Sequence, residues 1–98
     1  MRTNFPGRRG ASDISPLEAE VMAEKAAALA HTGRRVEAAL AALAASPDAA
    51  DRPQRLKAAA DAVYGFFIQR ELLGLRDHRP AIAHYAIPRE VLARLGAS

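Results

Sequence analysis

The segment from Pro53 to Leu73 restricts the fold more than any other part of this sequence, because its apolar residues recur with the period of an α-helix. Its principal face carries Leu56, Ala59, Ala60, Val63 and Phe67. In its second half, Tyr64 and Ile68 on one flank and Phe66 on the other make the segment apolar almost all round. We therefore predict a long central helix over about 53–73 that is covered by several neighbours or by a second subunit.

Alanine limits how thick the core around this helix can be. Half of the 98 residues are apolar, but 24 of them are alanine, so few large side chains remain and the helices must pack closely. The alternation typical of strands does not appear. The sequence predicts an all-α protein, a compact bundle of four to five helices, in which residues 13–98 form a single domain.

Local signals place two helices before the central one. Ser15-Pro-Leu-Glu18 is a capping box with proline at the first helical position, so the first helix should begin at Pro16. Glycine can adopt the left-handed conformation that ends a helix, which predicts a break at His31-Thr32-Gly33 and a second helix over about 34–45. Pro47 should end that second helix, because proline disfavours helical geometry in the residue before it.

Similar signals bound the central helix and the segments after it. Asp51 is expected to cap the central helix and Gly74 to close it. Gly65 suggests a close helix crossing, since an interior glycine costs roughly 1 kcal/mol relative to alanine. Asp77 is expected to cap a short helix, and a last helix should follow over 88–95, so that the bundle ends in a C-terminal pair of short helices.

The excess of basic residues lies near the N-terminus. The formal net charge is +3, yet residues 13–98 hold 11 basic and 11 acidic groups, because Arg2, Arg8 and Arg9 precede the first acid. Residues 1–12 also contain proline and glycine and little apolar surface, so we expect them to form a disordered basic tail. The body of the protein is neutral, and its charge therefore does not indicate nucleic-acid binding.

Several classes of protein can be set aside on composition. The chain has no cysteine, which excludes a disulfide framework and thiolate metal ligands and is typical of a reducing compartment. We find no secretory leader and no uncharged apolar stretch of roughly 18 residues, the length that crosses a bilayer. We expect a cytoplasmic protein without a membrane partner.

Three stretches resemble an uncharacterised bacterial family of short all-helical proteins. They are Tyr64-Gly-Phe-Phe-Ile-Gln-Arg-Glu71, Gly74-Leu-Arg-Asp-His-Arg79 and Tyr85-Ala-Ile-Pro-Arg-Glu-Val-Leu-Ala-Arg-Leu-Gly96. The similarity is strongest over residues 60–96 and looser over 14–96. It implies a helical fold, and it implies no activity, cofactor or site.

Charged and imidazole side chains gather where the central helix is expected to end. The cluster comprises Arg70, Glu71, Arg76, Asp77 and His78. It could form a ligand pocket or an interaction site, but ion pairs at a helix end explain it more simply, because helix termini leave backbone groups that attract such side chains. We favour the structural interpretation of this cluster.

Catalytic chemistry is not indicated. His78 and His84 are six residues apart and do not share a helix face, and no cysteine or well-placed serine nucleophile accompanies them. Glu20, Glu24 and His31 lie on one stripe of the first helix, but the Glu-x-x-His pair of carboxylate metal sites is missing, so we expect a solvated face. We predict no catalytic residue, no metal and no cofactor, and we do not expect an enzyme.

Residues 81–95 have the outline of a helix-turn-helix, in which Arg89 and Arg94 would contact DNA. Ile82 falls where such motifs usually need a small residue, and Ala86 replaces the usual turn glycine. A structural helical hairpin therefore explains these residues better. DNA binding is kept as the alternative function.

Apolar surface in excess of what a small monomer can cover favours self-association. Phe66, Leu73 and Leu75 are the least accounted for within a bundle of this size, so we predict them at a homodimer interface. The sequence as a whole indicates a module for protein–protein interaction, acting as a homo-oligomer or as an adaptor for another protein.

Overall fold

The computed structural model describes residues 14–46 and 48–95, which form four α-helices and no strand. The helices are α2 (Pro16–Ala44), α3 (Arg52–Leu72), α4 (Arg79–Tyr85) and α5 (Arg89–Leu92). The predicted all-α class is confirmed. The expected tail over 1–12 and the residues Pro47 and Gly96 lie outside the described part of the chain.

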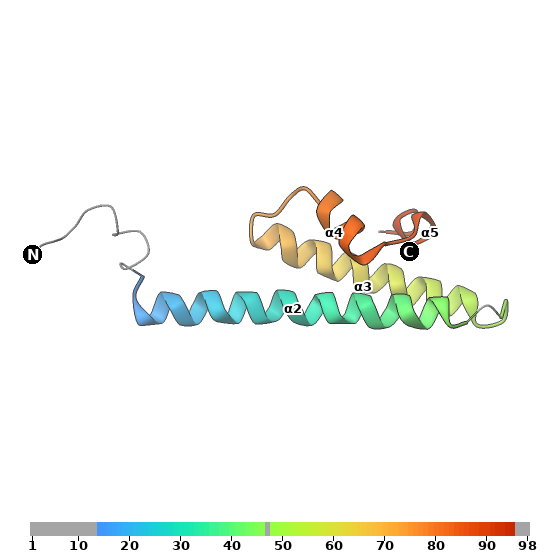
Figure 1. Cartoon of the computed structure of the whole chain (residues 1–98), viewed down its shortest axis with the longest axis horizontal. Coiled ribbons are helices and arrows are strands. Elements are labelled where there is room, and N and C mark those ends of the chain that lie inside the picture. Colours follow the sequence, from blue (N-terminus) through green and yellow to red (C-terminus); the bar gives the residue numbers. More distant parts are fainter. Residues whose placement is uncertain (1–13, 47, 96–98) are drawn as a thin grey trace, which may run out of the picture.

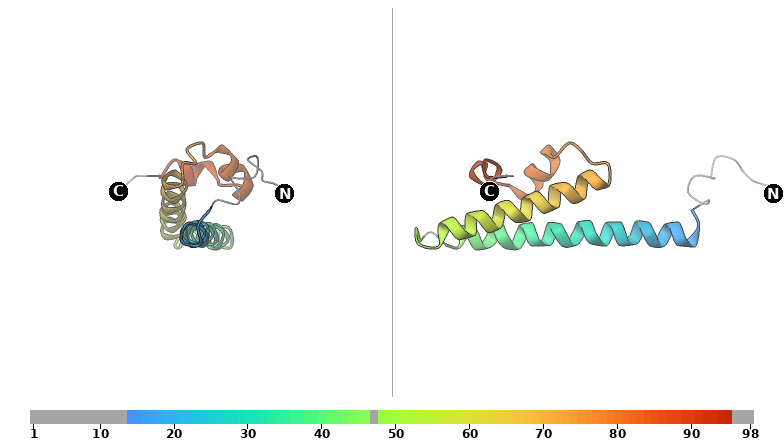
Figure 2. Two further views of the ribbon diagram at one scale, coloured as in Figure 1. Left: turned by 90° about the vertical axis from the view of Figure 1, so that its left-hand side faces the viewer. Right: turned by 180° about the vertical axis from the view of Figure 1, so that it is seen from behind.

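Figure 1 shows α2 and α3 as an antiparallel hairpin, with α4 and α5 folded back along α3. The two long helices lie side by side near their connection and diverge toward the other end, which the views of Figure 2 also show. The N-terminal part of α2 extends beyond the end of α3.

The first helix is continuous, and the predicted break at residues 31–33 is wrong. The helix begins as expected, because the Ser15 hydroxyl accepts from the Glu18 N–H at 3.0 Å and the Glu18 carboxylate accepts from the Ser15 N–H at 2.9 Å. It then runs through Gly33 to Ala44. Thr32 does not start a new helix, since its hydroxyl donates to the carbonyl of Leu29 at 2.8 Å within the same helix.

Gly33 stays inside the helix because another residue occupies the space of its missing side chain. A Cβ atom at this position would lie 2.5 Å from the Tyr85 hydroxyl oxygen and 3.5 Å from the Tyr85 Cζ atom. The close helix crossing that was expected at Gly65 is not found, since a Cβ atom there would meet nothing within 4 Å; the glycine in close contact is Gly33, with the Tyr85 side chain. Packing between α2 and α4 outweighs the cost of glycine in a helix.

Turns of the backbone fix both ends of α3, and the predicted side-chain cap by Asp51 is not formed. Asp51 occupies the N-cap position but makes no capping bond through its side chain. The Asp48 carboxylate instead accepts from the Ala50 N–H at 3.0 Å, and the Asp48 carbonyl accepts from the Arg52 N–H at 3.1 Å. At the other end Gly74 closes the helix as predicted, with φ of 86° and the Leu75 N–H donating to the Arg70 carbonyl.

Three valines from three helices form the centre of the core. Val36 of α2, Val63 of α3 and Val91 of α5 are fully buried. The buried residues around them are Leu43, Ala59, Ala60, Ala62, Phe66, Phe67, Ala81 and Ile87. The core is thin, as the alanine content predicts, and an ion pair between Arg52 and Glu90 joins the start of α3 to α5 outside it.

A left-handed residue separates the two short helices. Ala86 has φ of 52° and ψ of 51°, and the Ile87 N–H donates to the Ile82 carbonyl at 3.0 Å. The same arrangement closes α3, where the left-handed residue is glycine. Alanine is strained here, because its Cβ atom crowds the following carbonyl oxygen by roughly 1–2 kcal/mol.

The contact between Gly33 and Tyr85 predicts a coupled pair of substitutions. Gly33→Ala should lower the free energy of unfolding by about 1 kcal/mol, because overpacking exceeds the gain in helix propensity. In the Tyr85→Phe background the same change should raise it by up to about 1 kcal/mol, since the obstructing oxygen is gone. Urea unfolding of the four chains measures the coupling. Equal effects of Gly33→Ala in both backgrounds would show that the hydroxyl is not the obstacle.

The strain at Ala86 gives a second prediction. Ala86→Gly should stabilise the protein by about 0.5–1 kcal/mol, because relief of the left-handed strain exceeds the added freedom of the unfolded chain. The matched control is Ala83→Gly, an exposed position inside α4, which should destabilise by about 1 kcal/mol. Destabilisation by both changes, measured as unfolding midpoints, would contradict the assigned role of Ala86.

Candidate functional site

The predicted cluster lies where α3 ends and the chain turns back toward α4. The turn at Gly74 reverses the chain, so that Asp77 and His78 return alongside the last turn of α3. Arg70 and Glu71 are contributed by that turn of the helix. Four of the five predicted residues are therefore connected by hydrogen bonds, and Arg76 is exposed and makes no hydrogen bond or ion pair with the rest of the described chain.

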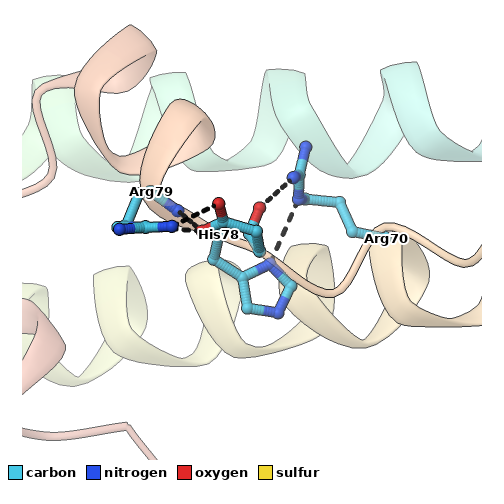
Figure 3. A network of polar contacts seen from close by, with 4 residues as sticks. Arg70, His78 and Arg79 are labelled. Carbon is cyan, nitrogen blue, oxygen red and sulfur yellow. Dashed lines mark hydrogen bonds and ion pairs between the residues drawn. The ribbon is translucent and has the colours of Figure 1, made fainter.

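Arg70 holds the returning chain through two bonds (Figure 3). Its Nε–H donates to Nδ1 of His78 at 3.1 Å, and its Nη2 donates to the carbonyl of Asp77 at 2.7 Å. Both acceptors are neutral. The expected ion pair between Arg70 and an acid is thus replaced by a clamp on the loop backbone and on an imidazole.

The bonds of His78 determine its tautomer. Because Nδ1 accepts from Arg70, the ring proton lies on Nε2, which donates to the Glu71 carboxylate at 2.8 Å. The ring also stacks on Phe67, with the ring centres 4.1 Å apart and the planes parallel. Both nitrogens and one ring face are occupied, so His78 joins the loop to α3.

Asp77 stabilises the start of α4. Its carboxylate accepts from the Arg79 backbone N–H at 3.1 Å and from the Arg79 guanidinium at two positions, both 2.9 Å. The guanidinium bonds, and next the backbone bond, lower the pKa of Asp77 from its ordinary 3.8 to about 2. The same pair raises the pKa of Arg79. The predicted cap at Asp77 thus lies one residue before the N-cap position, which His78 occupies.

An open groove of about 260 Å³ lies on the α4 side of Arg70. Its lining residues are Phe66, Arg70, Pro80, Ala81, His84 and Tyr85. Tyr85 packs edge-on against Phe66, with ring centres 5.4 Å apart, and His84 packs edge-on against Tyr85 at 4.6 Å. The groove is therefore the outer edge of the contact between α3 and α4. No local pattern in the sequence connects Tyr85 with Gly33 or with this groove.

Of the residues expected at a dimer interface, the structure places only Leu75 at the surface. Phe66 is 5% exposed and contacts Tyr85, so our expectation for Phe66 is corrected: its side chain fills the core of its own chain. Leu73 is half-buried, and Leu75 is 43% exposed. Other large apolar side chains are exposed on the first half of α2 and on the second half of α3.

The helix-turn-helix outline is present in reduced form. The second helix was expected over 88–95, but α5 is only four residues long and continues as turns to Leu95. Val91 faces the core, while Arg89 and Arg94 are exposed. A helix of four residues is roughly 6 Å long, which is short for an element that reads the major groove.

No three potential metal ligands of histidine, aspartate or glutamate come together within residues 14–46 and 48–95. Glu20, Glu24 and His31 are exposed along α2. None of the helices described in the structure has the length and apolarity required to cross a bilayer.

The fold and the cluster define a small all-α protein in which a long helical hairpin is completed by two short helices fastened through a histidine–arginine clamp. The chain belongs to the family of unknown function DUF6665, whose model matches residues 7–98. This confirms the resemblance to an uncharacterised family. Comparisons with curated proteins and with solved structures give no match.

The lowered pKa of Asp77 predicts how stability depends on pH. Because the pKa is lower in the folded chain, the ion pair with Arg79 contributes stability above pH 3.8 that is lost as the pH falls through about 2. Asp77→Asn should therefore lower the melting temperature at neutral pH, and the difference from the unmodified chain should shrink between pH 4 and pH 2. Melting curves of both chains across this range test it; a difference independent of pH would contradict the assigned ion pair.

Proposed function

We propose that this protein is a helical protein–protein interaction module that forms a homodimer. The observation that carries the proposal is the exposed apolar surface on the first half of α2. We call residues 16–28 the projecting half of α2, since it extends beyond the end of α3 (Figure 1). Every residue from Ile14 to Ala28 is exposed, and burial along α2 begins at Leu29.

The projecting half carries large apolar side chains in contact with solvent. Leu17 is 69% exposed, Met22 56% and Val21 41%, and Ile14 just before the helix is 41% exposed. A helix of roughly 15 residues is marginal in water without tertiary contacts. A partner that covers these side chains would stabilise the projecting half and explain why they are apolar.

A second apolar stripe lies on α3. Tyr64, Ile68 and Leu72 recur every four residues and are 52%, 39% and 73% exposed. Ile68 is two residues from Phe66 and hence roughly 200° around the helix from the side that contacts Tyr85 of α4. Leu17 is likewise roughly 160° around α2 from Gly33, which faces the same tyrosine. Leu17 and the stripe on α3 therefore point away from α4, whereas Met22 lies roughly 20° around α2 from Gly33 and points to the side on which the core packs.

The free energy available from burying these side chains is comparable to the cost of association. Fully burying a large apolar side chain contributes roughly 1.5–3 kcal/mol. Each subunit has four such side chains at the projecting half, and they are already partly covered. Together the two subunits would gain on the order of 10 kcal/mol. Association costs roughly 4–15 kcal/mol in lost rigid-body freedom. The stripe on α3, with Leu73 and Leu75 beyond its end, would supply the remainder.

The proposed role is binding rather than catalysis. His78, the imidazole of the candidate cluster, has both nitrogens in hydrogen bonds and one ring face against Phe67, which supports a structural role. DNA binding through Arg89 and Arg94 is the less favoured alternative, because α5 is a single turn. The proposal includes a cytoplasmic location, which the lack of cysteine favours.

A charge introduced into the projecting half should abolish the dimer. Val21→Asp places a carboxylate in the exposed apolar stripe, and light scattering at micromolar concentration should then give the mass of one chain instead of two. Ala23→Asp is the matched control, because Ala23 is exposed in the same half of α2 but lies roughly 200° around the helix from Val21. A monomeric unmodified protein, or equal dissociation by both variants, would contradict the proposal.

A further inference from the structure

The charged side chains along α2 indicate the relative direction in which two copies of this helix would pair. Glu20, Glu24, His31 and Arg35 occupy one stripe, since positions separated by four, seven and four residues return to nearly the same side of a helix. All four side chains are exposed. The stripe borders Leu17 and thus runs along the edge of the exposed apolar surface.

The charges of this stripe are complementary to those of a second copy only when the two helices are antiparallel. Its first half is acidic, at Glu20 and Glu24, and its second half carries an imidazole at His31 and a guanidinium at Arg35. When two copies lie antiparallel, the acidic half of each faces the basic half of the other. When two copies lie parallel and in register, Glu20 faces Glu20 and Arg35 faces Arg35, which is repulsive.

We propose that the occupant of the exposed surface of α2 is a second copy of this chain, with the two α2 helices antiparallel and crossing near Ala27 and Ala28. This inference rests on the homodimer proposed above and adds its direction. In this pairing Glu20 of one subunit lies near Arg35 of the other, and Glu24 lies near His31. The small side chains at the crossing allow the two helix backbones to approach closely.

The antiparallel pairing also fits the position of the core. The core of each subunit packs on α2 from Leu29 onward, through Gly33, Val36 and Leu43. The projecting half of one subunit would therefore lie beside the second half of the partner's α2, on a side where His31, Arg35 and Ala38 are exposed. A parallel pairing would leave the two bodies next to each other at the same end.

The lack of cysteine allows a direct test by cross-linking. Glu20→Cys and Arg35→Cys are prepared as separate full-length proteins, and each is treated with a short bis-maleimide, alone and as a mixture. The antiparallel dimer predicts a cross-linked pair in the mixture and at most traces in either protein alone. Glu37→Cys is the control, because Glu37 is exposed on the opposite flank of α2 and should not cross-link in any combination.

The outcomes separate the two proposals. If light scattering of the unmodified chain gives a monomer, the homodimer and the direction both fail. If the protein is a dimer but each variant cross-links with itself, the pairing is parallel, so the direction is wrong and the proposed function stands. A dimer in which no combination cross-links shows that this flank of α2 is outside the interface, which also overturns the inference.

Charge reversal gives an independent readout in the same protein. Glu20→Arg should raise the Kd of the dimer about tenfold, because two symmetric attractive contacts become repulsive. Adding Arg35→Glu to the same chain should restore the original Kd, since the reversed charges are again complementary in the antiparallel arrangement. Failure of the second change to restore the affinity would contradict the pairing of these two positions.

Discussion

The contact between the Tyr85 hydroxyl and Gly33 is the constraint on which the arrangement of the helices depends. The Tyr85 side chain reaches from α4 to α2, where its hydroxyl oxygen would lie 2.5 Å from a Cβ atom at position 33. Tyr85 in turn lies edge-on against Phe66 of α3, so one aromatic side chain joins three helices. The clamp from Arg70 to His78 then fixes the loop that precedes α4. The other short helix, α5, is held separately by the buried Val91 and by the ion pair between Arg52 and Glu90.

Local signals in the sequence predicted those features whose cause is local. The capping box at Ser15 and the closing glycine at position 74 formed as expected, because both depend on bonds between residues a few positions apart. Gly33 was misread because a glycine that ends a helix and one that admits a neighbour look the same in the sequence. The neighbour that decides between them, Tyr85, is 52 positions later, and no local pattern identifies it.

The members of the candidate site were predicted in part: Arg76 makes no bond with the others, and Arg79, which was not predicted, pairs with Asp77. Arg70, Glu71, Asp77 and His78 lie on either side of one turn, so their proximity follows from the position of Gly74 alone. The details depend on three-dimensional geometry: the stacking on Phe67 decides which way the imidazole faces, and hence that Arg70 donates to it. Phe66 was correctly predicted to lie in the long helix, but its contact with Tyr85 of α4 was not predicted.

The mismatch in length between the two long helices connects the fold to its proposed role. α2 has 29 residues and α3 has 21, so α2 is longer by roughly 12 Å. The two short helices cannot cover this excess, because α4 returns from the end of α3 toward the hairpin connection, as Tyr85 meeting Gly33 shows. The contact that organises the core thus leaves the first half of α2 without a partner in the described chain. In the homodimer that we propose, a second copy covers the apolar side chains of that half and lies beside its acidic residues Glu20 and Glu24.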